Sequence, residues 1–287
     1  MLDLDPTRAA PPTRDAATLV VVRDGASGLE VFCVERHKTG FLGGAVVFPG
    51  GKLEPSDLDP AWIDRSTPPR ATSVPWATDE ATARGLAVAA CREALEEATL
   101  LPVAGATLDH ATLLDWRIRL ARKETTLLAL LANAGARTDL AALHPFARWV
   151  TPAAETRRFD TRFFLMVADG STTGAHDDRE TTASFWATPT EVLRRFAAHE
   201  LQLVPPTHRT LELLATAGDA RGAIDLAARA CLEPICPRLV TQADARGETM
   251  ALVLPGDPAH DVREPRVTGR SRYVLRGDRF LPEDPPA

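Results

Sequence analysis

The feature that most constrains the fold is a helical segment from Asp79 to Leu100 whose two sides differ in chemistry. At about 100° per residue, the carboxylates of Glu93, Glu96 and Glu97 fall on one narrow side of the helix. The nearly opposite side carries mostly small apolar residues, namely Ala87, Ala90, Cys91, Ala94, Ala98 and Leu101. Small side chains allow a helix to pack closely on a sheet. The segment therefore predicts a helix pressed against a β-sheet, with an acidic stripe on its other side.

The acidic stripe is unfavourable by itself. Carboxylates three and four residues apart repel each other, and these also lie near the negative C-terminal end of the helix. A bound hard cation would reverse both penalties, because Mg²⁺ and Mn²⁺ prefer carboxylate oxygens. The alternative is a solvated charged face that Arg92 partly neutralises. Carboxylates alone favour this alternative, so the metal hypothesis needs support from elsewhere in the chain.

A pair of glycines offers that support. Gly50 and Gly51 follow a short apolar run, Ala45 to Phe48, and precede the acidic helix. Glycines at this place let backbone carbonyls approach a metal or a phosphate closely, whereas a simple tight turn is the alternative. Upstream, the β-rich runs 17–23 and 29–36 flank a turn signal and predict a hairpin.

Together these residues resemble the Nudix box, G-x5-E-x7-R-E-U-x-E-E-x-G-U, in which U is a bulky aliphatic residue. Five residues separate Gly51 from Asp57, and the later part of the box is the run Arg92-Glu93-Ala94-Leu95-Glu96-Glu97-Ala98-Thr99-Leu100. Asp57 stands for the first glutamate, Ala94 for the bulky residue and Thr99 for the late glycine. Residues 58–91 replace the seven-residue spacer, an insertion of 27. No departure removes a carboxylate from the R-E-x-x-E-E core.

The place of the insertion narrows the resemblance. A box split after Phe48-Pro49-Gly50-Gly51 is similar to that of the coenzyme A diphosphatase-like subgroup called Nudix-type motif 19. Three later segments are also similar to this subgroup: Trp149 to Phe164, Pro205 to Leu211, and Leu254 to His260. The resemblance covers residues 15 to 280, nearly the whole chain.

The resemblance implies an α+β fold of the Nudix type, an α/β/α sandwich with a mixed β-sheet. We expect a Nudix hydrolase domain over residues 15–204, with an insertion at 58–78 inside the box. A C-terminal extension over 205–287, with helices and a β-hairpin, is expected to pack on it. The hydrophobic periodicity and turn signals predict further helical segments at 108–133, 190–199, 207–215 with Thr207 as cap, and near 223–230. They also predict strands at 147–150, 161–168, 249–254 and 272–275.

The resemblance also implies a metal-dependent mechanism. Glu93, Glu96 and Glu97, together with the backbone of Gly50, would hold one or more Mg²⁺ or Mn²⁺ ions. Such ions neutralise a diphosphate and lower the pKa of a bound water. Arg92 would hold the helix carboxylates in place.

A further carboxylate is needed to accept the proton of the attacking water. Glu93 and Glu180 are the candidates. Glu180 matches the family by its place in the chain rather than by a motif, and a solvated loop acid is the alternative. Asp57 is the candidate partner of Arg92, although its side chain is shorter than the glutamate of the family.

Five residues are candidates for contact with the substrate: Lys38, Trp62, Trp76, Arg157 and Arg158. The arginines suit bidentate contacts to phosphate, and an ion pair with Asp160 is the alternative. Lys38 follows a β-rich run next to Arg36 and His37, where a bland surface cluster is the alternative. The two tryptophans lie in the Pro-rich insertion, which we interpret as an ordered loop without regular elements. That loop is predicted to be a lid or wall of the substrate site.

Composition limits the partners. The net charge of −6 argues against general nucleic-acid binding. The sequence shows neither a signal-peptide pattern nor an apolar run long enough for a membrane span, and it ends in Pro-Pro-Ala rather than a peroxisomal Ser-Lys-Leu signal. We therefore expect a cytoplasmic protein with a small-molecule nucleotide substrate. A homodimer is compatible with the sequence.

Three functions remain open at this stage. The first is hydrolysis of coenzyme A or acyl-coenzyme A to 3',5'-ADP and (acyl-)phosphopantetheine. The second is hydrolysis of another nucleoside diphosphate derivative, such as a dinucleotide, ADP-ribose or a nucleotide sugar. The third is a binding protein on an inactive Nudix fold, which the complete R-E-x-x-E-E core disfavours.

Overall fold

The computed structural model describes residues 4–5, 9–38, 43–72, 76–177, 180–244 and 246–285. Residues 73–75 of the predicted insertion lie outside this part of the chain. Within it, a nine-stranded mixed sheet runs in the order β10-β3-β2-β1-β8-β7-β11, with β4 paired to β1 and β9 paired to β2. Its strands are β1 (Arg14–Gly25), β2 (Gly28–Arg36), β3 (Ala45–Val47), β4 (Gly50–Lys52), β7 (His144–Val150), β8 (Phe159–Val167), β9 (Thr181–Ala187), β10 (Gln202–Leu203) and β11 (Pro234–Ile235).

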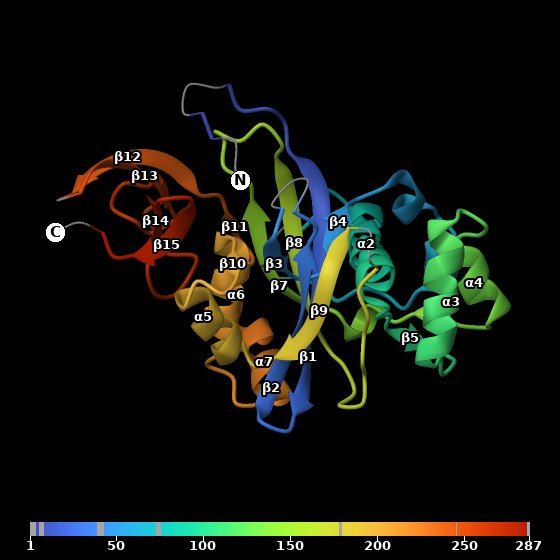
Figure 1. The fold of residues 1–287 in the computed structure, drawn as a ribbon. Coiled ribbons are helices and arrows are strands. Elements are labelled where there is room, and N and C mark those ends of the chain that lie inside the picture. Colours follow the sequence, from blue (N-terminus) through green and yellow to red (C-terminus); the bar gives the residue numbers. More distant parts are fainter. Residues whose placement is uncertain are drawn as a thin grey trace.

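The long strand β1 organises this sheet. It pairs with β2 as the predicted hairpin, with β4 in antiparallel register, and with β8 in parallel register along Arg14 to Val22. Its side chains alternate between two cores, as expected of a strand. Leu19 and Val21 pack in the first core, and Val20 and Val22 in the second. Both faces of the sheet are therefore covered, which confirms the predicted mixed-sheet sandwich (Figure 1).

The first core contains α2 (Glu80–Ala98), the predicted acidic helix. It begins at Asp79, whose carboxylate accepts the backbone N–H of Thr82. Helices α3 (His110–Ala121) and α4 (Leu127–Asn133) and the two-stranded sheet of β5 (Val103–Ala104) and β6 (Arg137–Thr138) lie on the same side. The helical stretch expected over 108–133 is divided into these two helices, because Lys123 takes a positive φ of 58° and Thr126 caps a new helix.

The insertion is more regular than expected. It contains the short helix α1 (Trp62–Arg65) and directly follows the 3-10 helix η1 (Pro55–Leu58). A second 3-10 helix, η2 (Leu140–Ala142), lies further along the chain. The prediction of a loop without regular elements is therefore wrong. The Trp62 indole N–H donates to the carbonyl of Ser56 at 2.9 Å, which ties α1 to η1.

The second core joins the other face of the sheet to three helices, α5 (Pro189–Ala197), α6 (Pro205–Leu214) and α7 (Ala220–Ala228). Figure 1 shows these helices across the sheet from α2. Thr207 is not the cap of α6, because Pro205 and Pro206 fill its first turn and Val204 precedes it. Proline suits this place, where an N–H has no helical partner.

The C-terminal part forms a second sheet rather than the single β-hairpin expected. Its four strands run in the order β12 (Arg238–Asp244), β13 (Gly247–Val253), β14 (Arg272–Arg276) and β15 (Arg279–Glu283). Strand β11, from the same part of the chain, pairs with β7 and so belongs to the main sheet. In the described part of the chain, no helix has the length and apolar character needed to cross a membrane.

Candidate active site

The glycine pair forms a strand rather than a tight turn. Gly50 and Gly51 lie in β4, opposite Thr18 and Ala17 of β1. A Cβ on Gly50 would come within 2.6 Å of the Ala17 carbonyl oxygen, and one on Gly51 would overlap the Glu93 carboxylate. Only glycine therefore allows the strand and the acidic helix to approach so closely. The glycines thus bring the backbone of β4 next to the Glu93 carboxylate, whereas the expected approach of their carbonyls to a metal or phosphate stays a prediction.

Glu97 is the most enclosed of the helix carboxylates, at 3% exposed. The Gly50 N–H donates to its Oε2 at 3.1 Å, and the Arg36 guanidinium lies 3.5 Å from its Oε1. Burial raises the pKa of Glu97 to about 8, although Arg36 and the Gly50 N–H act in the opposite direction. The positive charge around this carboxylate is therefore too weak to offset its burial.

Arg92 holds the other two helix carboxylates. Its Nε and one terminal nitrogen donate to Asp57 at 2.8 and 2.9 Å, while its other terminal nitrogen lies 2.8 Å from Glu93 and 3.5 Å from Glu96. The expected Asp57–Arg92 pair is confirmed, because η1 brings the shorter aspartate within reach. Burial raises the pKa of Glu93 and takes the pKa of Glu96 to about 7, against the effect of Arg92.

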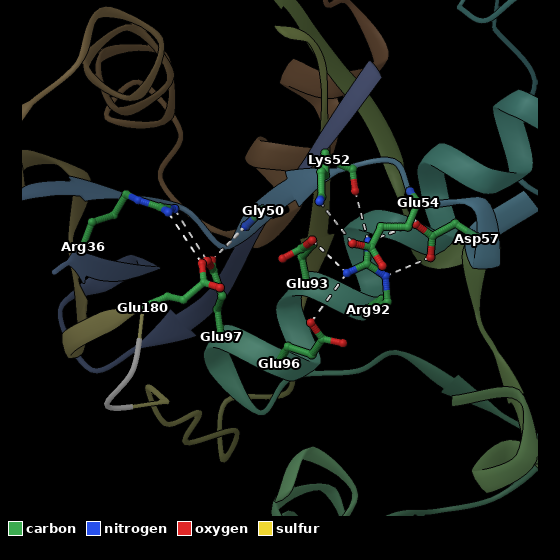
Figure 2. A network of polar contacts seen from close by, with 10 residues as sticks. All are labelled: Arg36, Gly50, Lys52, Glu54, Asp57, Arg92, Glu93, Glu96, Glu97 and Glu180. Carbon is green, nitrogen blue, oxygen red and sulfur yellow. Dashed lines mark hydrogen bonds and ion pairs between the residues drawn. The ribbon is translucent and has the colours of Figure 1, made fainter. Parts of the chain in front are cut away.

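Glu180 reaches the same edge of the sheet from the segment before β9. Its carboxylate lies 3.7 Å from Arg36, and its backbone carbonyl accepts the N–H of His37 at 2.8 Å. Figure 2 shows Glu97 and Glu180 meeting at the guanidinium of Arg36, while Glu93 and Glu96 turn toward Arg92. The structure thus brings Glu180 to the helix carboxylates, as its candidate role requires.

The carboxylates satisfy the chemistry of a divalent cation site. Among the described residues, no three His, Cys, Asp or Glu side chains converge as a ready-made metal cluster. Four glutamates and Asp57 instead share two arginines, and the three helix glutamates all have a raised pKa. Oxygen-rich sites with excess negative charge are those that Mg²⁺ and Mn²⁺ occupy. The donor set therefore fits such an ion, once the side chains turn from the arginines to a common point.

The end of α2 departs from the motif without losing the helix. Thr99, which stands for the glycine of the Nudix box, takes a left-handed φ of 56°. This conformation is unfavourable for a β-branched residue. The Arg117 guanidinium donates to the Thr99 hydroxyl at 2.7 Å and to the carbonyls of Ala175 and His176 at 2.9 and 2.8 Å. These contacts stabilise the left-handed conformation at the end of α2, which glycine would adopt without such support.

A cavity of about 300 Å³ opens beside β4. Strand residues of the main sheet line one wall, among them Ala16, Thr18, Trp149, Thr161 and Phe163. A later part of the chain completes the lining with Val204, Pro205, Pro206, Thr207, Pro237 and Leu252. Arg36, Gly50, Gly51 and Lys52 lie where the cavity meets the carboxylates. Arg36 belongs to the basic cluster that the sequence offered for phosphate contact, whereas neither the cavity nor Lys52 was predicted.

The candidate substrate residues are not brought together. Trp62 and Trp76 are 3% and 5% exposed and belong to the first core, where Trp76 meets Phe164 edge-on at 5.7 Å. No described residue of the insertion lines this cavity, so the predicted lid or wall of the substrate site stays a prediction. Both indoles are buried in the first core with α2, whereas the cavity is lined by residues of the second core such as Phe163 and Leu252.

The candidate cations differ among themselves. The Arg158 guanidinium donates to the carbonyls of Thr151 and Pro11 at 3.1 and 2.8 Å, so its position is fixed by the backbone. Asp160 pairs with Arg148 at 2.7 Å and with Arg162 at 3.1 Å. Arg157 and Lys38 are exposed. Of the predicted substrate cations, these two therefore present side chains at the surface.

A mixed sheet that holds a carboxylate-bearing helix beside a glycine strand defines the chain as a Nudix hydrolase. The family model described as the NUDT19 Nudix domain matches residues 13–214, and the chain belongs to this family. The expected family, fold class and enzyme class are confirmed.

Similar proteins agree with this assignment. The chain is similar to the acyl-coenzyme A diphosphatase NUDT19 of Gallus gallus, with 25% identity over 88% of this chain and 77% of the relative. The protein of the same name from Homo sapiens is 29% identical over 88% of this chain and 76% of its own length. The crystal structure of a Nudix hydrolase from Alicyclobacillus acidocaldarius is 35% identical, with a TM-score of 0.61, and the match covers 75% of this chain and 96% of that one.

Proposed function

We propose that this Nudix hydrolase cleaves the diphosphate of coenzyme A or acyl-coenzyme A to 3',5'-ADP and (acyl-)phosphopantetheine. The observation that carries the proposal is the meeting of an acidic edge with an apolar cavity at Gly50 and Gly51. A substrate with a charged centre and a long uncharged arm matches both halves of this site. The names of the relatives from Gallus gallus and Homo sapiens support the same substrate class.

The carboxylates of Glu93, Glu96 and Glu97, with the backbone of Gly50, would hold Mg²⁺ or Mn²⁺. Such an ion supplies neutralisation of the diphosphate and a bound water of lowered pKa. Arg92 holds Glu93 and Glu96 beside this position and the Gly50 N–H holds Glu97, so each carboxylate would turn from these partners to the ion.

Two groups complete the reaction. Glu93 or Glu180 accepts the proton of the attacking water, since both carboxylates belong to the acidic edge. Arg36 touches Glu97 and Glu180 and also lines the cavity, so its guanidinium can exchange a carboxylate partner for phosphate oxygens.

The test is a comparison of diphosphate substrates. The purified protein is incubated with Mg²⁺ or Mn²⁺ and separately with coenzyme A, octanoyl-coenzyme A, dephospho-coenzyme A, NADH, ADP-ribose and a nucleotide sugar. We expect the highest kcat/KM for coenzyme A or its acyl derivative. The 3'-phosphate should favour coenzyme A over its dephospho form by about 1.5–3 kcal/mol, the contribution of a hydrogen bond to a charged group. Faster cleavage of NADH or ADP-ribose contradicts the substrate, and no cleavage of any compound favours the binding-protein alternative.

A further inference from the structure

The cavity beside β4 lies on the face of the sheet away from α2. Phe163, Trp149 and Leu252 among its lining residues belong to the second core, whereas α2 packs in the first. The cavity and the carboxylates therefore meet along the short strand β4 and at Arg36, the last residue of β2. A substrate whose diphosphate lies at this strand extends one of its two arms into the cavity and leaves the other outside.

The lining of the cavity is uncharged away from this strand. Arg36 and Lys52 are its charged lining residues among those described, and both lie beside the carboxylates. The other polar side chains of the lining are hydroxyls: Thr18, Thr151, Thr161 and Thr207. Arg158, which is close to the Thr151 end, is bound to backbone carbonyls. Placing a 3'-phosphate in this space would bury a dianion without a partner, at a large free-energy cost.

We propose that the cavity binds the acyl-pantetheine arm of the substrate and that its lining residues between 204 and 252 select this arm. The inference rests on the proposed function and adds the orientation of the substrate. The pantetheine amides find hydroxyl partners in the threonines, and an acyl chain meets the wall of Pro205, Pro206 and Leu252. The 3',5'-ADP half then stays outside the cavity.

The orientation is tested by narrowing the cavity. Ala16 lines its sheet wall opposite Thr161 in the register of β1 and β8. In Ala16→Ile, titration calorimetry with Mn²⁺ should show at least about tenfold weaker binding of 4'-phosphopantetheine, as expected when an occupied pocket is overfilled. Binding of 3',5'-ADP should change less than about twofold by the same reasoning. Ala243→Ile, at an exposed position of β12, is the matched control and should change neither affinity.

If Ala16→Ile lowers the melting temperature, Thr161→Ile is a second variant that narrows the cavity, because it adds one non-hydrogen atom at a smaller change of volume. Weaker binding of 3',5'-ADP with unchanged phosphopantetheine binding would place the nucleotide in the cavity and overturn the orientation. Equal effects on both halves, or on neither, would also contradict it. Hydrolysis of octanoyl-coenzyme A by the wild type is measured alongside, and its absence refutes the proposed function. If the wild type hydrolyses this substrate but Ala16→Ile weakens binding of 3',5'-ADP rather than of phosphopantetheine, only the orientation is refuted.

Discussion

The two faces of the main sheet differ in the charged side chains that lie along them. Along the α2 face, carboxylates crowd so closely that burial raises the pKa of Glu97 to about 8 and arginines act as their partners. Across the sheet, the cavity is lined by aromatic, proline and threonine side chains. Gly50 and Gly51 border both regions. The contrast shows that the charged side chains of the site lie along β4, whereas the cavity available for a substrate arm has few charged side chains.

The largest effect is expected at the acidic face. Glu97→Gln keeps the shape of the side chain but removes a charged ligand. Since a catalytic metal contributes several kcal/mol of transition-state stabilisation, kcat should fall at least about a hundredfold. Steady-state hydrolysis of octanoyl-coenzyme A measures this, with circular dichroism to verify the fold. Glu248→Gln, exposed on β13, should keep the wild-type rate. Near-native turnover of Glu97→Gln would show that the carboxylate face is not the reactive one.

Substitutions in the insertion should change the stability of the fold more than they change substrate binding. Trp62 is 3% exposed in the first core, so Trp62→Ala should lower the free energy of unfolding by about 3–5 kcal/mol. Its neighbour Ile63 is 65% exposed, and Ile63→Ala should change stability by less than about 0.5 kcal/mol. Urea denaturation gives both values. If Trp62→Ala instead raised KM at unchanged stability, the insertion would be a wall of the substrate site after all.

Arg36 links the two regions, and its removal is expected to have an intermediate effect. Arg36→Gln removes a cation that faces Glu97 and Glu180 and lines the cavity. We expect KM for coenzyme A to rise about tenfold, the lower end for a lost charged hydrogen bond. Arg221→Gln, on a side chain that is 82% exposed, is the matched control. A loss of kcat with unchanged KM would mean that Arg36 acts in the transition state instead.

The smallest effect concerns pH. The pKa of Glu97 is about 8 in the folded protein, above the ordinary value of 4.5, so the metal-free folded state retains a proton that the unfolded state has lost. The stability that the folded state gains from protonated Glu97 is therefore fully present below about pH 4.5 and is lost as pH rises through 8. Mn²⁺ must displace this proton, so it should raise the melting temperature more at pH 8.5 than at pH 6. An equal rise at both pH values would contradict the raised pKa.

The sequence could predict the acidic face because its residues are close in the chain. Helical periodicity alone aligns Glu93, Glu96 and Glu97, and the motif brings Asp57 to Arg92. The cavity could not be predicted in this way. Its walls come from β1, β7, β8, residues 204–207 and the C-terminal sheet, and only tertiary packing brings these segments together.

The two tryptophans show why the composition of the insertion could not predict its role. Trp62 and Trp76 in a Pro-rich segment are compatible with either a ligand wall or a core anchor, and the choice depends on which side of α2 the segment covers. The structure packs both against the first core. Similarly, Thr207 fits a helix cap in sequence, but two prolines before it extend α6 toward the N-terminus.

The central claim is that metal-dependent attack on a diphosphate takes place at the α2 edge. The most direct measurement is hydrolysis of octanoyl-coenzyme A in ¹⁸O-labelled water, with products analysed by mass spectrometry before and after removal of metal with a chelator. We predict 3',5'-ADP and octanoyl-phosphopantetheine, one of them carrying a single ¹⁸O, with activity abolished by the chelator and restored by Mg²⁺ or Mn²⁺. Release of octanoic acid with an intact diphosphate, or cleavage that survives complete metal removal, would contradict it.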